Sequence, residues 1–254
     1  MSRPQNIDRW LGKLIRARLN PDLLIGRSRE GYRDITHPAL KCKILVVDNS
    51  DIYPLGRSNL PCTEWNAASE GWRVLFDKSI IAPCVESLSL PLIEEDGSGN
   101  YLVKYDALGM IFWMLSRSEE FNRQDLDRHG RFQAVRSHAY LHQYLDRPLA
   151  DEWIDILRQI MMKAWNMTEF ITSNFQVQVS HDIDSPAKFS KRPFIRTACL
   201  AGGEILHRRD LREAWRTIYT SMGSDFEIGN LDPHNTFDWL MDHSEKNNLQ
   251  STFY

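Results

Sequence analysis

The segment FQVQVSHDIDSP, residues 175–186, decides how the second half of the chain folds. Its first residues alternate between polar and apolar side chains, as in a half-buried β-strand, and its closing Ser–Pro pair ends the run. Successive side chains of a strand point to opposite faces, so residues two apart share a face. We therefore expect a strand over 176–184, with Asp182 and Asp184 projecting together from its carboxyl end.

Two carboxylates at the end of a strand indicate a functional role. Two like charges on one face repel each other unless a cation lies between them, so the arrangement costs stability. The carboxyl ends of parallel strands are also where ligands bind in α/β folds. Asp182 and Asp184 therefore predict a divalent metal site, or a general base beside a metal ligand.

The residues that follow predict a helical crossover and a second strand. The segments 188–206 and 208–223 have helical patterns, and 232–248 predicts a capped helix before the strand STFY at 251–254. Together with the first strand they form a βαβ unit. The inner stripe of the capped helix is expected to be Phe237, Leu240 and Met241.

Two stretches of this half, VSHDIDSP at 179–186 and DPHNTFDWLMDHSEKNNLQSTFY at 232–254, resemble the start of the polysaccharide deacetylase family, the NodB-homology carbohydrate esterases. The most similar branch is that of bacterial surface-polysaccharide and lipopolysaccharide biosynthesis, where a larger N-terminal domain precedes the catalytic barrel. The resemblance implies an α/β protein, and the patterns of residues 1–170 indicate a mixed α+β N-terminal domain. Residues 171–254 would be the first βα units of an incomplete (β/α) barrel.

By the same resemblance Asp182 is the catalytic base and Asp184 a ligand of a divalent metal, zinc in this family. The metal would polarise the acetamide carbonyl of an N-acetylated sugar, and Asp182 would take the proton of the attacking water. The products would be acetate and an amine. His181 stands where the family motif has phenylalanine, and we expect its side chain to face away from the aspartates.

The chain also departs from the family pattern. The second family motif, H-[ST]-x-x-H, carries the other two metal ligands, and it does not occur before the chain ends at Tyr254. We expect the 254 residues to be an N-terminal piece or a natural remnant, inactive as it stands. The strand STFY would then leave an unpaired edge, which predicts self-association through it.

The first half reads as core structure. KILVV at 43–47 predicts a buried strand, and 90–106 predicts a hairpin whose turn residues tolerate positive φ. Asp106 is placed to cap a helix over 106–121. A second helix is indicated by an apolar stripe at helical spacing, formed by Leu149, Trp153, Ile156, Leu157, Ile160, Met161 and Ala164.

HAYLH places His138 and His142 four residues apart, on one face if the segment is helical. This is a metal-ligand spacing, but the glutamate of H-E-x-x-H is absent. Tyr140 and Tyr144 beside the histidines favour a packing role.

Composition excludes some classes of protein. The net charge is −3 over 254 residues, which argues against binding along a nucleic-acid backbone. The four cysteines form no C-x-x-C pair, so we expect reduced thiols in a cytoplasmic protein. The first residues lack the apolar core of a signal peptide, and no apolar stretch is long enough to span a bilayer.

Three other functions fit a D-x-D after a strand. A nucleotide-sugar glycosyltransferase would use it to hold a metal against a diphosphate, but the first half has no nucleotide-binding strand–loop pattern. A phosphatase would use the first aspartate as nucleophile, but Ser185–Pro186 does not suit that motif. In a non-catalytic carbohydrate-binding or protein-binding module, the aspartates would be remnants or caps.

Overall fold

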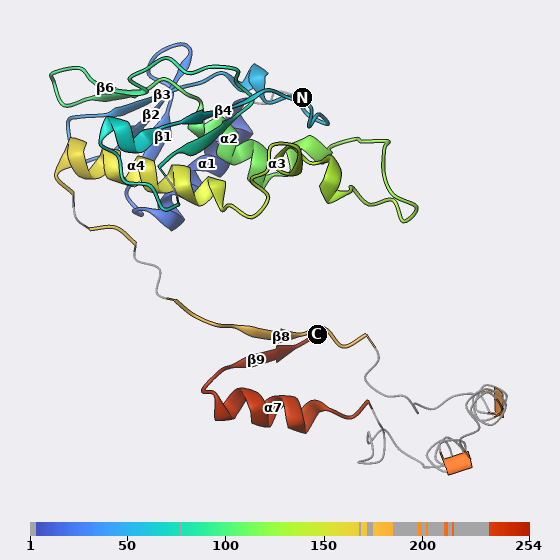
Figure 1. The fold of residues 1–254 in the computed structure, drawn as a ribbon. Coiled ribbons are helices and arrows are strands. Elements are labelled where there is room, and N and C mark those ends of the chain that lie inside the picture. The colour runs from blue at the N-terminus through green and yellow to red at the C-terminus, as the bar shows by residue number, and fades with distance from the viewer. Residues whose placement is uncertain are drawn as a thin grey trace. The chain divides into compact units, whose positions relative to one another are not determined.

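The computed structural model describes residues 4–76, 78–167, 169–171, 175–184 and 234–254, with positions 198–199, 202, 211–212 and 215. The chain divides into two compact units, Met1–Thr172 and Ser173–Tyr254, and each is described by itself (Figure 1). The predicted mixture of helices and strands is confirmed, whereas the described residues form no closed barrel. The helices predicted over 188–206 and 208–223 lie almost wholly outside the described residues.

Unit 1 is built on a five-stranded mixed sheet. Its strands stand in the order β1-β2-β3-β7-β6, where β3 and β7 run parallel and the other neighbours antiparallel. A separate antiparallel pair joins β4 and β5. The strands are β1 (Leu24–Gly26), β2 (Tyr32–Thr36), β3 (Ile44–Val47), β4 (Cys62–Trp65), β5 (Ile80–Pro83), β6 (Ile93–Glu95) and β7 (Tyr101–Val103).

Helices complete the unit. Helices α2 and α4 pack on each other, and both contact β3 (Figure 1). No helix in the part of the chain that the structure describes is long and apolar enough to cross a membrane. The α-helices are α1 (Pro4–Arg18), α2 (Ala107–Leu115), α3 (His138–Leu141) and α4 (Leu149–Trp165), and short 3-10 helices lie at Ser50–Ile52, Ala67–Glu70, Ser118–Glu120 and Ala134–Arg136.

The local predictions for this unit are confirmed. The strand at 43–47 is β3, and the hairpin is β6–β7, whose turn is closed by the Asp96 carboxylate accepting from the backbone of Ser98 and Asn100. Asp106 caps α2 by accepting from the Gly109 backbone N–H at 2.7 Å. Helix α2 ends before residue 121 because Arg117 adopts a left-handed conformation, with φ 53°.

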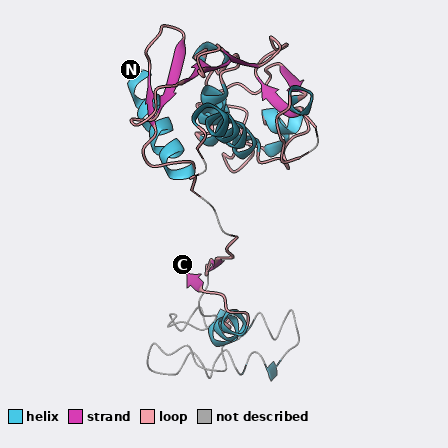
Figure 2. Ribbon diagram, turned by 90° about the vertical axis from the view of Figure 1, so that its left-hand side faces the viewer, coloured by secondary structure: helices cyan, strands magenta, loops and turns pink. Residues whose placement is uncertain are grey.

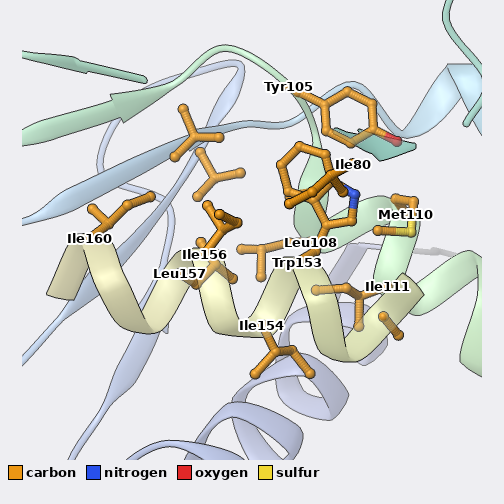
Figure 3. Packing of buried hydrophobic residues seen from close by; sticks show 14 of the residues in the cluster. Ile80, Tyr105, Leu108, Met110, Ile111, Trp153, Ile154, Ile156, Leu157 and Ile160 are labelled. Atoms are coloured by element: carbon orange, nitrogen blue, oxygen red, sulfur yellow. The ribbon is translucent and has the colours of Figure 1, made fainter. Parts of the chain in front are cut away.

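The predicted stripe of α4 forms the centre of the core (Figure 3). Trp153 is fully buried and stacks on Trp65, with ring centroids 5.7 Å apart. Its other ring neighbour is Tyr105, at 4.9 Å, and its indole N–H donates to the Ile81 carbonyl at 2.9 Å. One side chain thus joins α4 to β4, to β5 and to the segment that leads from β7 into α2.

A buried arginine crosslinks the other side of the unit. Arg33 on β2 is 1% exposed, and its guanidinium contacts three carboxylates. Asp8 of α1 lies at 2.9 Å, Asp48 after β3 at 2.7 Å, and Asp106 at the start of α2 at 3.1 Å. Arg27 adds a second cation, paired with Asp8 and Asp48. The cluster therefore ties two helices to two strands.

Burial in this cluster disfavours the charged form of the Asp106 carboxylate. Desolvation raises the pKa of Asp106 to about 6, although Arg33 and two backbone N–H groups, of Gly109 and Asn49, act in the opposite direction. The carboxylate therefore depends on Arg33 for its charged form.

Unit 2 is described through two strands and one helix. Strands β8 (Val179–His181) and β9 (Ser251–Phe253) pair in parallel, and α7 (Phe237–Lys246) lies beside them (Figure 2). The predicted parallel pair and the helix before β9 are thus confirmed. Within the predicted inner stripe, Phe237 and Leu240 are half-buried, but the prediction for Met241 is wrong because its side chain is exposed.

Replacing Arg33 with alanine is expected to lower the free energy of unfolding of unit 1 by about 3–5 kcal/mol, because Asp106 would stay buried without its cation and Asp48 would keep only Arg27. Denaturant unfolding followed by tryptophan fluorescence measures the loss. Arg9→Ala is the matched control, since Arg9 is exposed and its loss is expected to change stability by less than about 0.5 kcal/mol. Equal losses in the two variants would contradict the assigned role.

Candidate functional site

Asp182 and Asp184 lie at the carboxyl end of β8, as predicted. The strand itself is shorter than the expected 176–184, because β9 offers a pairing partner only from Ser251 to Phe253. Pairing nevertheless continues past the strand, since the Ile183 N–H donates to the Tyr254 carbonyl at 3.1 Å. Asp182 therefore sits on backbone that stays paired with β9, whereas the chain bends at Asp184.

Exposure alternates from residue to residue along β8 and just past its end. Ser180, Asp182 and Asp184 are exposed, whereas the residues between them are only partly exposed. This alternation is that of a strand with one covered face. Both aspartates are on the exposed side of this alternation. Their common direction and their roles as base and ligand stay predictions.

The covered face is aromatic. The His181 ring stacks on Phe253 of β9, with centroids 4.6 Å apart and planes at 30°. Phe253 in turn contacts Phe237 of α7 at 5.5 Å. His181 thus faces away from the aspartates, as predicted. Its Nε2 is buried and has no hydrogen-bond partner among the residues that the structure describes, an unusual state for a buried polar atom.

A tyrosine stands beside the carboxylates on the outer face. The Tyr254 N–H donates to the His181 carbonyl at 3.0 Å, and its carbonyl accepts from Ile183, so Tyr254 lies opposite Asp182. Its side chain is 76% exposed. The sequence reasoning missed this neighbour, because only the register of β9 against β8 reveals it.

The pair does not by itself complete a metal site. Neither aspartate makes a hydrogen bond or ion pair with another of the residues that the structure describes. Among those same residues, no three histidine, cysteine or acidic side chains are grouped so as to hold a metal. Zinc sites in proteins take three or four protein ligands, so Asp182 and Asp184 fit only part of such a site.

The outer edge of β9 is open within the described residues. Gln250 and Tyr254 bond to β8, so the backbone groups of Ser251 and Phe253 point to the other side by the alternation of the strand. Self-association through this edge stays a prediction.

The second predicted candidate, the histidine pair, serves packing. His138 is fully buried, its Nδ1 lies 2.6 Å from the Tyr144 hydroxyl, and its Nε2 lies 3.2 Å from the Pro61 carbonyl. The carbonyl can only accept, so Nε2 carries the proton and Nδ1 accepts from Tyr144. His142 contacts the Leu60 carbonyl at 2.9 Å through its own Nε2. Both nitrogens of His138 are therefore occupied, and the packing interpretation is confirmed.

The four cysteines are free. Two of them lie near the histidine pair, and burial raises the pKa of the Cys62 thiol to about 11 and that of Cys84 further still. A nucleophilic cysteine needs a lowered pKa, so neither thiol is suited to catalysis.

Part of unit 1 matches a known family model. Residues 42–166 match the model of a family of unknown function (DUF7033). No curated protein and no solved structure matches the chain. The matched segment runs from β3 to α4 inside unit 1, so it includes the histidine pair but neither Arg33 nor the aspartates of β8.

The buried histidine makes stability depend on pH. Burial lowers the pKa of His138 to about 4, from an ordinary value near 6.5. The unfolded chain therefore takes up the proton first as the pH falls, and the contribution of neutral His138, complete above about pH 6.5, is lost toward pH 4. Between pH 7 and 4.5 the wild type is expected to lose about 2 kcal/mol more than His138→Gln, as measured by urea unfolding. Parallel pH profiles of the two proteins would contradict this.

The unpartnered Nε2 of His181 gives a second prediction. His181→Phe is expected to keep or increase the protection of the Ile183 and Tyr254 amides in hydrogen exchange, because it keeps the ring stack and removes a buried unsatisfied nitrogen. His181→Ala should speed their exchange at least tenfold. Ser180→Ala, on the exposed face, is the control and should leave both rates unchanged. Unchanged protection in His181→Ala would show that the stack does not hold the strands.

Proposed function

We propose that this chain carries the general base and one metal-binding carboxylate of a metal-dependent deacetylase that acts on N-acetylated sugars. One observation supports the proposal above the others: Asp182 and Asp184 are both exposed and directly follow the carboxyl end of a strand whose parallel neighbour is β9. The resemblance of 179–186 and 232–254 to polysaccharide deacetylases points to the same chemistry.

In this proposal the two carboxylates divide the work. Asp182 accepts the proton of the attacking water, which an unpaired, exposed carboxylate at a strand end is free to do. Asp184 contributes one oxygen donor to the cation, and the cation, when bound, polarises the acetamide carbonyl. His181 and Phe253 hold the strand so that both carboxylates face the substrate side.

Nucleotide-sugar transfer is the second candidate. The number of carboxylate donors in this chain supports it, because an ion such as Mg²⁺ is commonly held by one or two carboxylates together with substrate phosphates. Asp182 and Asp184 alone would suffice for that arrangement, whereas a zinc site needs further protein ligands.

Metal titration tests the proposal without relying on activity. Calorimetric titration with zinc is expected to show binding that weakens at least tenfold in Asp184→Asn, because one of the donors loses its charge. Asp242→Asn is the matched control, an exposed aspartate of α7 in the same unit, and it should bind as the wild type does.

Two results would contradict the deacetylase proposal. The first is zinc binding that is identical in wild type and Asp184→Asn. The second is binding of a UDP-sugar that requires manganese and is lost in Asp184→Asn, which would assign the pair to glycosyl transfer instead.

A further inference from the structure

Unit 1 has a surface hollow that neither the aspartate pair nor the histidine pair uses. It holds about 730 Å³ and is open to solvent. It lies between the end of α3 and the start of α4, within the segment that matches the family of unknown function. Among the described residues, those that line it are Tyr140, Leu141, Gln143, Leu145 and Asp146.

Part of the lining is an apolar surface that the fold leaves uncovered. Tyr140, Leu141 and Leu145 are each about half exposed, at 50%, 49% and 55%. Three large apolar side chains around one hollow are more than the scattered exposure that any surface shows. A ligand with an apolar face would remove them from water.

The lining also carries polar groups. Within the described residues, the Tyr140 hydroxyl, the Gln143 amide and the Asp146 carboxylate make no side-chain hydrogen bond or ion pair. They offer donors and acceptors around an apolar floor, which is the usual composition of a ligand site.

Buried contacts of Tyr144 fix the course of the segment that lines the hollow. Tyr144, in the middle of the lining segment, is buried and bonded through its hydroxyl to His138. Its backbone N–H donates to the Ala139 carbonyl at 2.9 Å, and Gln143 takes a left-handed conformation with φ 58°. The side chains that alternate with Tyr144 are thus presented by a segment with a fixed course.

We propose that this hollow binds a neutral polysaccharide chain. A pyranose ring has an apolar C–H face, which suits the Tyr140 ring and the two leucines, and hydroxyl groups, which suit Gln143 and Asp146. The Asp146 carboxylate, with no paired cation, disfavours acidic glycans, and the free polar groups disfavour a purely apolar ligand. The choice of a glycan rests on the proposed function, whereas the hollow and its free groups do not.

Calorimetric titration of the chain with the hexamer of N-acetylglucosamine and with cellohexaose tests the proposal. Tyr140→Ala is expected to raise the Kd at least tenfold for a chain that binds, and Asp146→Asn to raise it about threefold. Phe121→Ala removes an aromatic ring that is 62% exposed but outside the hollow, and it should bind as the wild type does. A heparin hexasaccharide should bind at least tenfold more weakly than the neutral chains.

A double variant, Asp182→Asn with Asp184→Asn, separates this proposal from the deacetylase proposal. Unchanged glycan affinity in that variant, with lost affinity in Tyr140→Ala, supports a separate site in unit 1 whether or not the aspartates bind zinc. Wild type that binds neither neutral chain, or Tyr140→Ala that binds equally well, would overturn the proposal. So would a dimer that sedimentation velocity finds in the wild type and not in Tyr140→Ala, because the hollow would then be an interface between copies.

Discussion

A buried guanidinium is the constraint on which unit 1 depends. Arg33 is surrounded by three carboxylates that come from α1, from the loop after β3 and from the start of α2. A single buried ion pair rarely stabilises a protein relative to apolar packing, but removal of one partner leaves the others charged in a dry site. Arg33 therefore matters less for the net stability it adds than for the arrangement it permits. The two helices and β3 can take these positions only while β2 supplies the cation.

This condition bears on the extent of the domain. The match to the family of unknown function begins at residue 42, in front of β3, and so leaves out α1, β1 and β2. Yet β3 is a central strand that pairs with β2, and two aspartates of the matched segment, Asp48 and Asp106, form ion pairs with Arg33. In this chain the matched segment is therefore part of a larger folding unit, to which the preceding residues contribute a strand pair and a counterion.

What could be predicted from sequence was local. The stripe of α4, the hairpin turn at 96–100 and the cap of α2 each depend on residues within a few positions of one another, and all three were predicted correctly. The burial of Arg33 was not predicted, because its partners Asp8 and Asp106 lie 25 and 73 positions away. Nothing in the residues next to Arg33 indicates burial. The exposed apolar side chains around Tyr140 were not predicted for the same reason. A hollow forms where residues distant in the sequence leave a surface uncovered.

The aspartate pair lies between these two cases. Its common direction follows from strand alternation alone, but alternation does not say which face is covered. That is decided by His181 and Phe253, whose stack against Phe237 turns one face of β8 toward α7 and leaves the other to the carboxylates. The stack of His181 on Phe253 thus covers one side of β8 and leaves the exposed side to Asp182 and Asp184. Any ligand of the pair must approach on that outer face, where Tyr254 is the neighbouring ring.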